Sequence, residues 1–220
     1  MRKDLWLNYP ESSTLLWMAR QQQQSIWFHF LDVLLNIVII VAIVGLIRTF
    51  LVSPFQVEGD SMVDTLEDGE YIIINKLTYY IGQPQRGDVV VFRPPNDHSK
   101  HYVKRIIGVP GDEISIRNGF VYIKEKGTDR EVQLEELYLN DTNAGHTYKH
   151  PPSTQNQTEE NYGIIPEGFY FLMGDNRMAS RDSRSFPDFF VPEDDIKGRV
   201  WFVALPFNKL HVLEEATYTF

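Results

Sequence analysis

The sequence predicts a mainly β fold: an antiparallel β domain that follows one N-terminal transmembrane helix. Two observations predict it. One long apolar run, residues 33–47, has Asn36 as its only polar side chain. Beyond Pro54 the pattern changes to short β-branched and aromatic runs separated by turn residues. The chain has 220 residues, of which 43% are hydrophobic, and this is enough to bury one domain core beside such a helix.

The apolar run alone is short for a bilayer crossing of about twenty residues, but aromatic and aliphatic residues flank it on both sides. We therefore expect a membrane anchor over 27–52, ended by Pro54, after a polar tail of residues 1–26. A cleaved secretory signal should end in small residues at alternate positions, and no such residues stand at the end of this run. A buried core helix should carry a polar stripe, and 33–47 has almost none. Both alternatives are weaker than a retained anchor.

The remaining chain divides into a β core and a polar segment. Strand-like runs lie at 71–74, 88–92, 102–109, 114–117, 120–123, 169–173 and 200–205. Asn118 and Gly119 stand between two of these runs and predict a tight hairpin. Residues 124–165 are polar and loop-like, and we interpret them as an insertion, a small cap, on a β core of 53–123 and 166–220.

Composition excludes several classes of function. The net charge of −9 and the lack of a basic run argue against a nucleic-acid partner. The chain has no cysteine, which removes disulfides, thiolate zinc sites and cysteine nucleophiles. Its six histidines show no metal-ligand spacing, so no metal site is expected.

The candidate nucleophile is Ser61, which lies a few residues beyond the apolar run. A serine in a turn is ordinarily a turn former, and it becomes a nucleophile only beside a base. His98 and His101 lie in a loop that looks exposed. Lys104 lies among apolar neighbours in a strand-like run, and burial can lower a lysine pKa by about 3 to 5 units. The plainer interpretation is a lysine that extends from a strand edge into water.

At this point the chain resembles the type I signal peptidases, the bacterial leader peptidases. Four stretches match boxes of that family in order: Gly59 to Met62 with Thr65 and Leu66, residues 86–92, residues 102–112, and residues 174–184. The resemblance covers roughly 48–116 and 169–206. The single anchor with a compact insertion is similar to the forms found in Gram-positive bacteria.

The resemblance implies a serine endopeptidase with a Ser/Lys dyad and no metal or organic cofactor. Ser61 would attack the peptide carbonyl to form an acyl-enzyme, and Lys104 would be its general base. The supporting residues implied are Ser180, which would orient Lys104, and an ion-pair network of Asp182, Arg177 and Arg184. Two positions depart from the family pattern. Gly59 stands where some members place an oxyanion-hole serine, and Asp64 stands where the family usually has proline.

The resemblance also implies a substrate and a location. The enzyme would remove signal peptides from exported preproteins after small residues, at an Ala-X-Ala type site, with the substrate extended beside residues 56–59. Family positions that line the substrate pockets correspond to Val57, Met62, Leu66, Tyr102 and Val103. The partners would be signal peptides and the lipid bilayer. The chain would cross the cell membrane once, with its catalytic domain on the extracytoplasmic side.

Two other functions are compatible with parts of this pattern. A related self-cleaving Ser/Lys repressor-type peptidase would be cytosolic and would carry a DNA-binding segment, whereas residues 1–52 hold no basic recognition helix. A non-catalytic, membrane-anchored β domain that only binds a partner would not need Ser61 and Lys104 for its activity.

Overall fold

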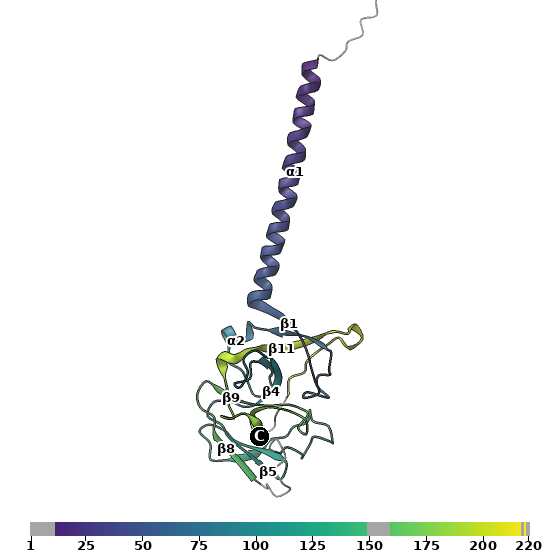
Figure 1. Ribbon diagram of the computed structural model, residues 1–220. Helices are drawn as coiled ribbons and strands as arrows, with labels where there is room; N and C mark the ends of the chain where they lie inside the picture. Colours follow the sequence, from purple (N-terminus) through teal and green to yellow (C-terminus); the bar gives the residue numbers. More distant parts are fainter. Residues whose placement is uncertain (1–11, 149–158, 217, 219–220) are drawn as a thin grey trace, which may run out of the picture. The chain divides into compact units, whose positions relative to one another are not determined.

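The computed structural model describes residues 12–148, 159–216 and 218, and describes side chains from residue 26 onward. The chain forms two compact units, Met1–Arg48 and Thr49–Phe220. The first is helical and the second is built of β-strands (Figure 1).

The helix α1 (Ser12–Leu46) continues as a π-helical turn, Ile47–Leu51. The helical segment Ile26–Leu51 contains an 18-residue window with a mean hydropathy of 2.9 and is long and apolar enough to cross a membrane. Residues 12–26, expected to be a polar tail or a short surface helix, form the first part of α1. The helical segment ends at Leu51, close to the expected end at Val52, and Pro54 lies inside the first strand. Residues 1–11 of the predicted tail lie outside the described residues.

The β unit contains a large antiparallel sheet with the strand order β1-β2-β11-β3-β4-β9-β10, in which β12 pairs with β11 (Figure 1). The elements of this sheet and the short helix beside it are β1 (Val52–Gln56), β2 (Tyr71–Asn75), α2 (Thr78–Ile81), β3 (Val89–Phe92), β4 (Tyr102–Gly108), β9 (Phe169–Met173), β10 (Val191–Pro192), β11 (Ile196–Leu205) and β12 (His211–Val212). The predicted mainly β, antiparallel fold is therefore confirmed.

A second, four-stranded sheet has the order β7-β6-β5-β8. Its strands are β5 (Glu113–Arg117), β6 (Phe120–Lys124), β7 (Glu131–Gln133) and β8 (Glu159–Ile164). The turn between β5 and β6 is the predicted hairpin, with Asn118 at φ +50° and Gly119 at φ +84°. The segment 124–165 is not wholly loop-like, because β7 and β8 pair with β6 and β5. The division into core and insertion stays a prediction.

The burial of strand β3 shows that the large sheet is covered on both faces at this point. All four of its residues are buried. Val89 and Val91 pack into one apolar cluster, and Val90 and Phe92 pack into another, as the alternation of side chains across a strand requires. Strand β4 pairs with β3, and its residues from Lys104 to Gly108 are also buried. Lys104 therefore lies among apolar side chains.

Candidate active site

Ser61 lies in the turn that follows β1, and three contacts hold this turn. Gly59 has φ +83°, a conformation that glycine adopts without steric cost, and its N–H donates to Asp68 Oδ1 at 2.7 Å. The Asn176 N–H donates to the Ser61 carbonyl at 3.1 Å. The Asn176 side chain donates to the Asp60 carbonyl at 3.0 Å. Among the described residues, the Ser61 N–H itself has no acceptor.

Lys104 lies on β4 with its amine against the Ser61 hydroxyl. Its Nζ is 2.6 Å from Ser61 Oγ and donates a second hydrogen bond, of 2.7 Å, to the Val103 carbonyl. The residue is only 3% exposed. Burial lowers the pKa of Lys104 from 10.5 to about 8, although the Asp182 and Asp175 carboxylates act in the opposite direction. A substantial fraction of the amine is therefore neutral near pH 8 and able to accept a proton.

Asp182 and Arg184 form a buried ion pair near Lys104. Arg184 donates through Nε to Asp182 Oδ1 at 2.9 Å and through Nη2 to Oδ2 at 2.7 Å. Burial would raise the pKa of Asp182, but the Arg184 guanidinium and the N–H of Gly174 lower it to about 2. The carboxylate stays charged, and its negative potential favours the protonated form of Lys104.

Arg177 was expected in the same network, but its carboxylate partner is Glu136. The guanidinium donates to both Glu136 oxygens, at 2.8 and 2.5 Å, and to Thr147 Oγ1 at 2.9 Å. Arg184 reaches this group through a 3.0 Å hydrogen bond to the Arg177 carbonyl. The network therefore includes Glu136 and Thr147 of the segment 124–165, which no sequence pattern connects with Ser61.

Ser180 does not make the hydrogen bond to Lys104 that the family resemblance implies. Its Oγ is buried and makes no hydrogen bond of ordinary geometry among the described residues, although the hydroxyl contributes to the lowered pKa of Asp182. A Cβ on Gly174 would lie 2.2 Å from Ser180 Oγ and 2.4 Å from the Ser61 carbonyl. The absence of a side chain at Gly174 thus allows Ser180 and the Ser61 turn to approach each other closely.

Sequence reasoning missed a second buried ion pair, Arg105 with Asp175. Arg105 donates to Asp175 through Nε at 3.0 Å and Nη2 at 2.7 Å. Thr65, four residues after Ser61, donates to the same carboxylate at 2.5 Å. This group ties β4 to the turn that carries Ser61. The only signal in the sequence was that these residues fall inside or beside the matching boxes.

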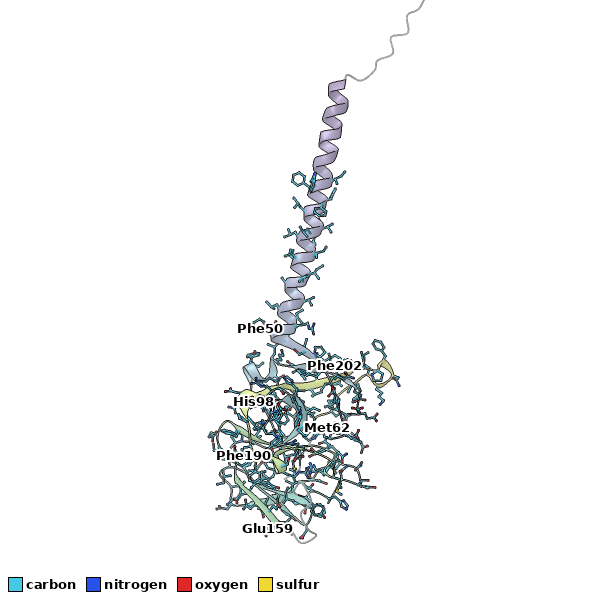
Figure 2. The ribbon with its side chains drawn as sticks, in the orientation of Figure 1. Phe50, Met62, His98, Glu159, Phe190 and Phe202 are labelled. Carbon is cyan, nitrogen blue, oxygen red and sulfur yellow. The ribbon has the colours of Figure 1, made fainter. Side chains whose placement is uncertain are left out.

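A cleft of about 480 Å³ opens beside Ser61 and Lys104. Three of the five predicted pocket residues, Val57, Tyr102 and Val103, line it. The other two, Met62 and Leu66, do not. Both are 0% exposed and pack in the core with Val57 (Met62 is labelled in Figure 2). They support the wall of the cleft from behind.

The remaining candidates lie at the margins. His101 lines the cleft and packs its ring 5.2 Å from that of Phe55. His98 lies 3.7 Å from Asp195. Asp64 is exposed and accepts a hydrogen bond from Asn140. Within the described ranges, no group of three or more histidine, aspartate or glutamate side chains is placed to hold a metal ion.

Comparison with known proteins identifies the class. The sequence model described as "Signal peptidase, peptidase S26" matches residues 30–205. Signal peptidase I of Bacillus amyloliquefaciens is 40% identical over 176 residues, which are 79% of this chain and 84% of that protein. Signal peptidase IB of Staphylococcus aureus is 35% identical over 187 residues, and the match covers 81% of this chain and 91% of that protein. The match to a crystal structure of a signal peptidase I from Enterococcus faecalis covers 54% of this chain and 97% of the chain in that structure, with 29% sequence identity and a TM-score of 0.40.

The family model and the two relatives at 35% and 40% identity show that the chain is an enzyme, a peptidase, and its apolar helix fits membrane anchoring. It belongs to the signal peptidase I family of serine endopeptidases, peptidase family S26.

Proposed function

We propose that this chain removes signal peptides from exported preproteins with a Ser61/Lys104 dyad, through an acyl-enzyme. The observation that carries the proposal is the 2.6 Å distance between Lys104 Nζ and Ser61 Oγ, combined with the burial that lowers the pKa of this lysine to about 8. A serine hydroxyl is a weak nucleophile until a neighbouring base removes its proton, and a neutral amine in contact with it is such a base.

The reaction proceeds in two halves. Neutral Lys104 takes the proton of Ser61 as Oγ bonds to the scissile carbonyl carbon, and the carbonyl oxygen becomes an oxyanion. The Ser61 N–H, which has no acceptor among the described residues, donates to that oxyanion. The Lys104 ammonium then protonates the leaving amine as the C–N bond breaks, which leaves an ester on Ser61. Lys104 next deprotonates a water that hydrolyses the ester and frees Ser61.

The cleft supports an extended substrate. Strand β1 is the edge of the large sheet, so a peptide can pair alongside it and send alternate side chains into the cleft. Val57, Tyr102 and Val103 line the cleft beside Ser61, and in this proposal they form the pockets for the small side chains of an Ala-X-Ala type site. In this proposal the helix Ile26–Leu51 crosses the cell membrane once and holds the β unit on the extracytoplasmic side.

The acyl-enzyme can be captured directly. A peptide ester that ends in an Ala-X-Ala sequence is mixed with the full chain in detergent, quenched in acid within milliseconds and analysed by mass spectrometry. We expect the acyl mass on the fragment that contains Ser61 and on no other. An adduct at another residue, or cleavage of the ester by a Ser61→Ala variant at the parental rate, would refute the proposal.

The pH dependence of cleavage should follow Lys104. Only the neutral amine is a base, so below its pKa of about 8 the rate should fall about tenfold per pH unit, and it should level off above pH 8. The measurement is kcat/KM for a soluble peptide from pH 5.5 to 9.5, with circular dichroism at each pH as the control for folding. A midpoint near the ordinary histidine pKa of about 6.5 would contradict a lysine base.

A further inference from the structure

The turn that carries Ser61 lacks a proline that would restrict its backbone. Residues 60–66 form two consecutive turns, and Ser61 lies in the first, which is closed by a hydrogen bond of 3.2 Å from the Val63 N–H to the Asp60 carbonyl. Asp64 lies in the second turn, at a position where the family resemblance implies proline. The ring of a proline fixes φ, whereas an aspartate leaves this angle free to vary. The conformation of the turn therefore depends on contacts from outside it.

Asp64 supplies one such contact through its side chain. Its exposed carboxylate accepts a hydrogen bond from the side-chain amide of Asn140, a residue 76 positions further along the chain. The amide oxygen of Asn140 in turn accepts two hydrogen bonds from Asn143, one of 2.9 Å from its N–H and one of 3.0 Å from its side chain. Asn140 cannot rotate away from Asp64 without losing both of these bonds.

Asn143 connects this pair to the segment 174–184. It is only 4% exposed, and its Oδ1 accepts a hydrogen bond of 3.2 Å from the Met178 N–H. Asn176, two residues before Met178, donates its N–H to the Ser61 carbonyl at 3.1 Å. Hydrogen bonds and short stretches of chain therefore form a closed circuit that starts and ends at the turn. Its members are, in order, Ser61, Asn176, Met178, Asn143, Asn140 and Asp64.

We propose that Asp64 and Asn140 are positioning residues for the nucleophile. Their hydrogen bond fixes the outer face of the turn, so that Ser61 Oγ keeps its 2.6 Å contact with Lys104 Nζ. The proposal rests on the Ser61/Lys104 dyad proposed above. In this chain the segment 124–165 thereby supplies, through one side chain, the stiffness that a proline would give the turn.

The inner contacts of the turn explain why loss of the outer contact should change the rate more than the fold. Met62 and Leu66 are 0% exposed, and Thr65 donates to the Asp175 carboxylate at 2.5 Å. These contacts keep the turn folded when the outer hydrogen bond is broken. A displacement of about 1 Å between reacting groups can still lower a rate by about 100-fold. Neither residue of the proposed pair lines the cleft, so KM should not change.

An exchange of the two side chains tests the proposal. Asn140→Asp sets two carboxylates against each other and breaks their hydrogen bond, although the new carboxylate can still accept both bonds from Asn143. We expect kcat for a soluble Ala-X-Ala peptide to fall roughly tenfold while KM stays within about twofold. Asp64→Asn, added to the same chain, again places an amide against a carboxylate. The kcat should then return to within about twofold of that of the parent.

The matched control is Asn161→Asp. Asn161 lies on β8 in the four-stranded sheet (Figure 1). It donates to Glu113 Oε1 at 3.1 Å and accepts from the Gly163 N–H at 2.7 Å, so this substitution also sets two carboxylates against each other on the surface. Thermal unfolding of the β unit, followed by circular dichroism, should show a similar loss of Tm in the two variants. Only Asn140→Asp should lower kcat.

An unchanged kcat in Asn140→Asp would overturn the proposal. So would a kcat that stays low in the exchanged double variant, or an equal loss of kcat in Asn161→Asp, because each would show that loss of the Asp64 hydrogen bond is not the cause. Parental cleavage by Ser61→Ala would instead refute the dyad on which the proposal rests. In a chain that Ser61→Ala inactivates, the other outcomes bear on the Asp64 and Asn140 pair alone.

Discussion

Ser61→Ala and Lys104→Met should each lower kcat for preprotein cleavage by about 10³-fold or more, and the double variant should be no slower than either single variant. The reason is that the two side chains act as one unit. The hydroxyl is a weak nucleophile without the amine, and the amine has no proton to remove without the hydroxyl. The measurement is cleavage of a preprotein with an Ala-X-Ala site by purified full-length chains in detergent.

The control variants are Ser99→Ala and Lys100→Met, which change the same residue types. Lys100 lines the same cleft as Ser61 but pairs with Asp97, and Ser99 is exposed. Both should retain activity within about threefold, as surface substitutions usually do. Lys104→Met should be at least as stable as the parent because it removes an amine whose charged form burial disfavours. Parental activity in either Ser61→Ala or Lys104→Met would exclude the dyad.

Arg184→Met should lower the free energy of unfolding by about 3 to 5 kcal/mol, because it leaves the Asp182 carboxylate buried without its partner. The two side chains are both 0% exposed, and Arg184 also donates to the carbonyls of Tyr148 and Arg177. Urea denaturation of the full chain in detergent, followed by the signal of the β unit, measures the change. Lys126→Met is the matched control. It breaks an exposed pair with Glu167 and should cost less than about 1 kcal/mol.

The loss should also depend on pH. Because the folded-state pKa of Asp182 is lowered to about 2, its contribution to stability is present above its ordinary value of 3.8 and is lost as the pH falls through 2. In Arg184→Met the burial of Asp182 is opposed by the Gly174 N–H and the Ser180 hydroxyl but no longer by a guanidinium, so its pKa rises above that of the parent and the folded variant takes up a proton at higher pH. The stability difference between parent and variant should therefore shrink as the pH falls from the variant's pKa toward about 2. A constant difference from pH 7 to pH 3 would contradict this account.

Local patterns were sufficient to predict most of the large sheet. Alternating apolar residues mark β4 and β9, and Asn118 with Gly119 fixes the β5–β6 hairpin because few residues adopt positive φ. The strands β7 and β8 were missed for a physical reason. Their sequences are polar, with most residues exposed or half-buried, and they become strands because β6 and β5 offer them free edges. That information lies in the partner strands, outside the local sequence.

The candidate active site, too, could be predicted only in part from local sequence. The position of Lys104 in an apolar strand could be predicted from its neighbours, but its contact with Ser61, 43 residues away, depends on how β1 and β4 sit in one sheet. Likewise, nothing local distinguishes Met62 and Leu66, which are core residues, from Val57, which lines the cleft. Their different positions depend on how the whole β unit packs.

The partnership between Arg177 and Glu136 has a consequence for anyone who wishes to trim this protein. A shortened version that loops out residues 125–165 would delete Glu136 and Thr147, and it would also delete Tyr138, whose ring lies 4.0 Å from the Arg105 guanidinium. Two buried arginines would lose partners at once. The polar segment looks dispensable from its sequence, but it supplies partners to two buried arginines. A shortened enzyme therefore has to keep it.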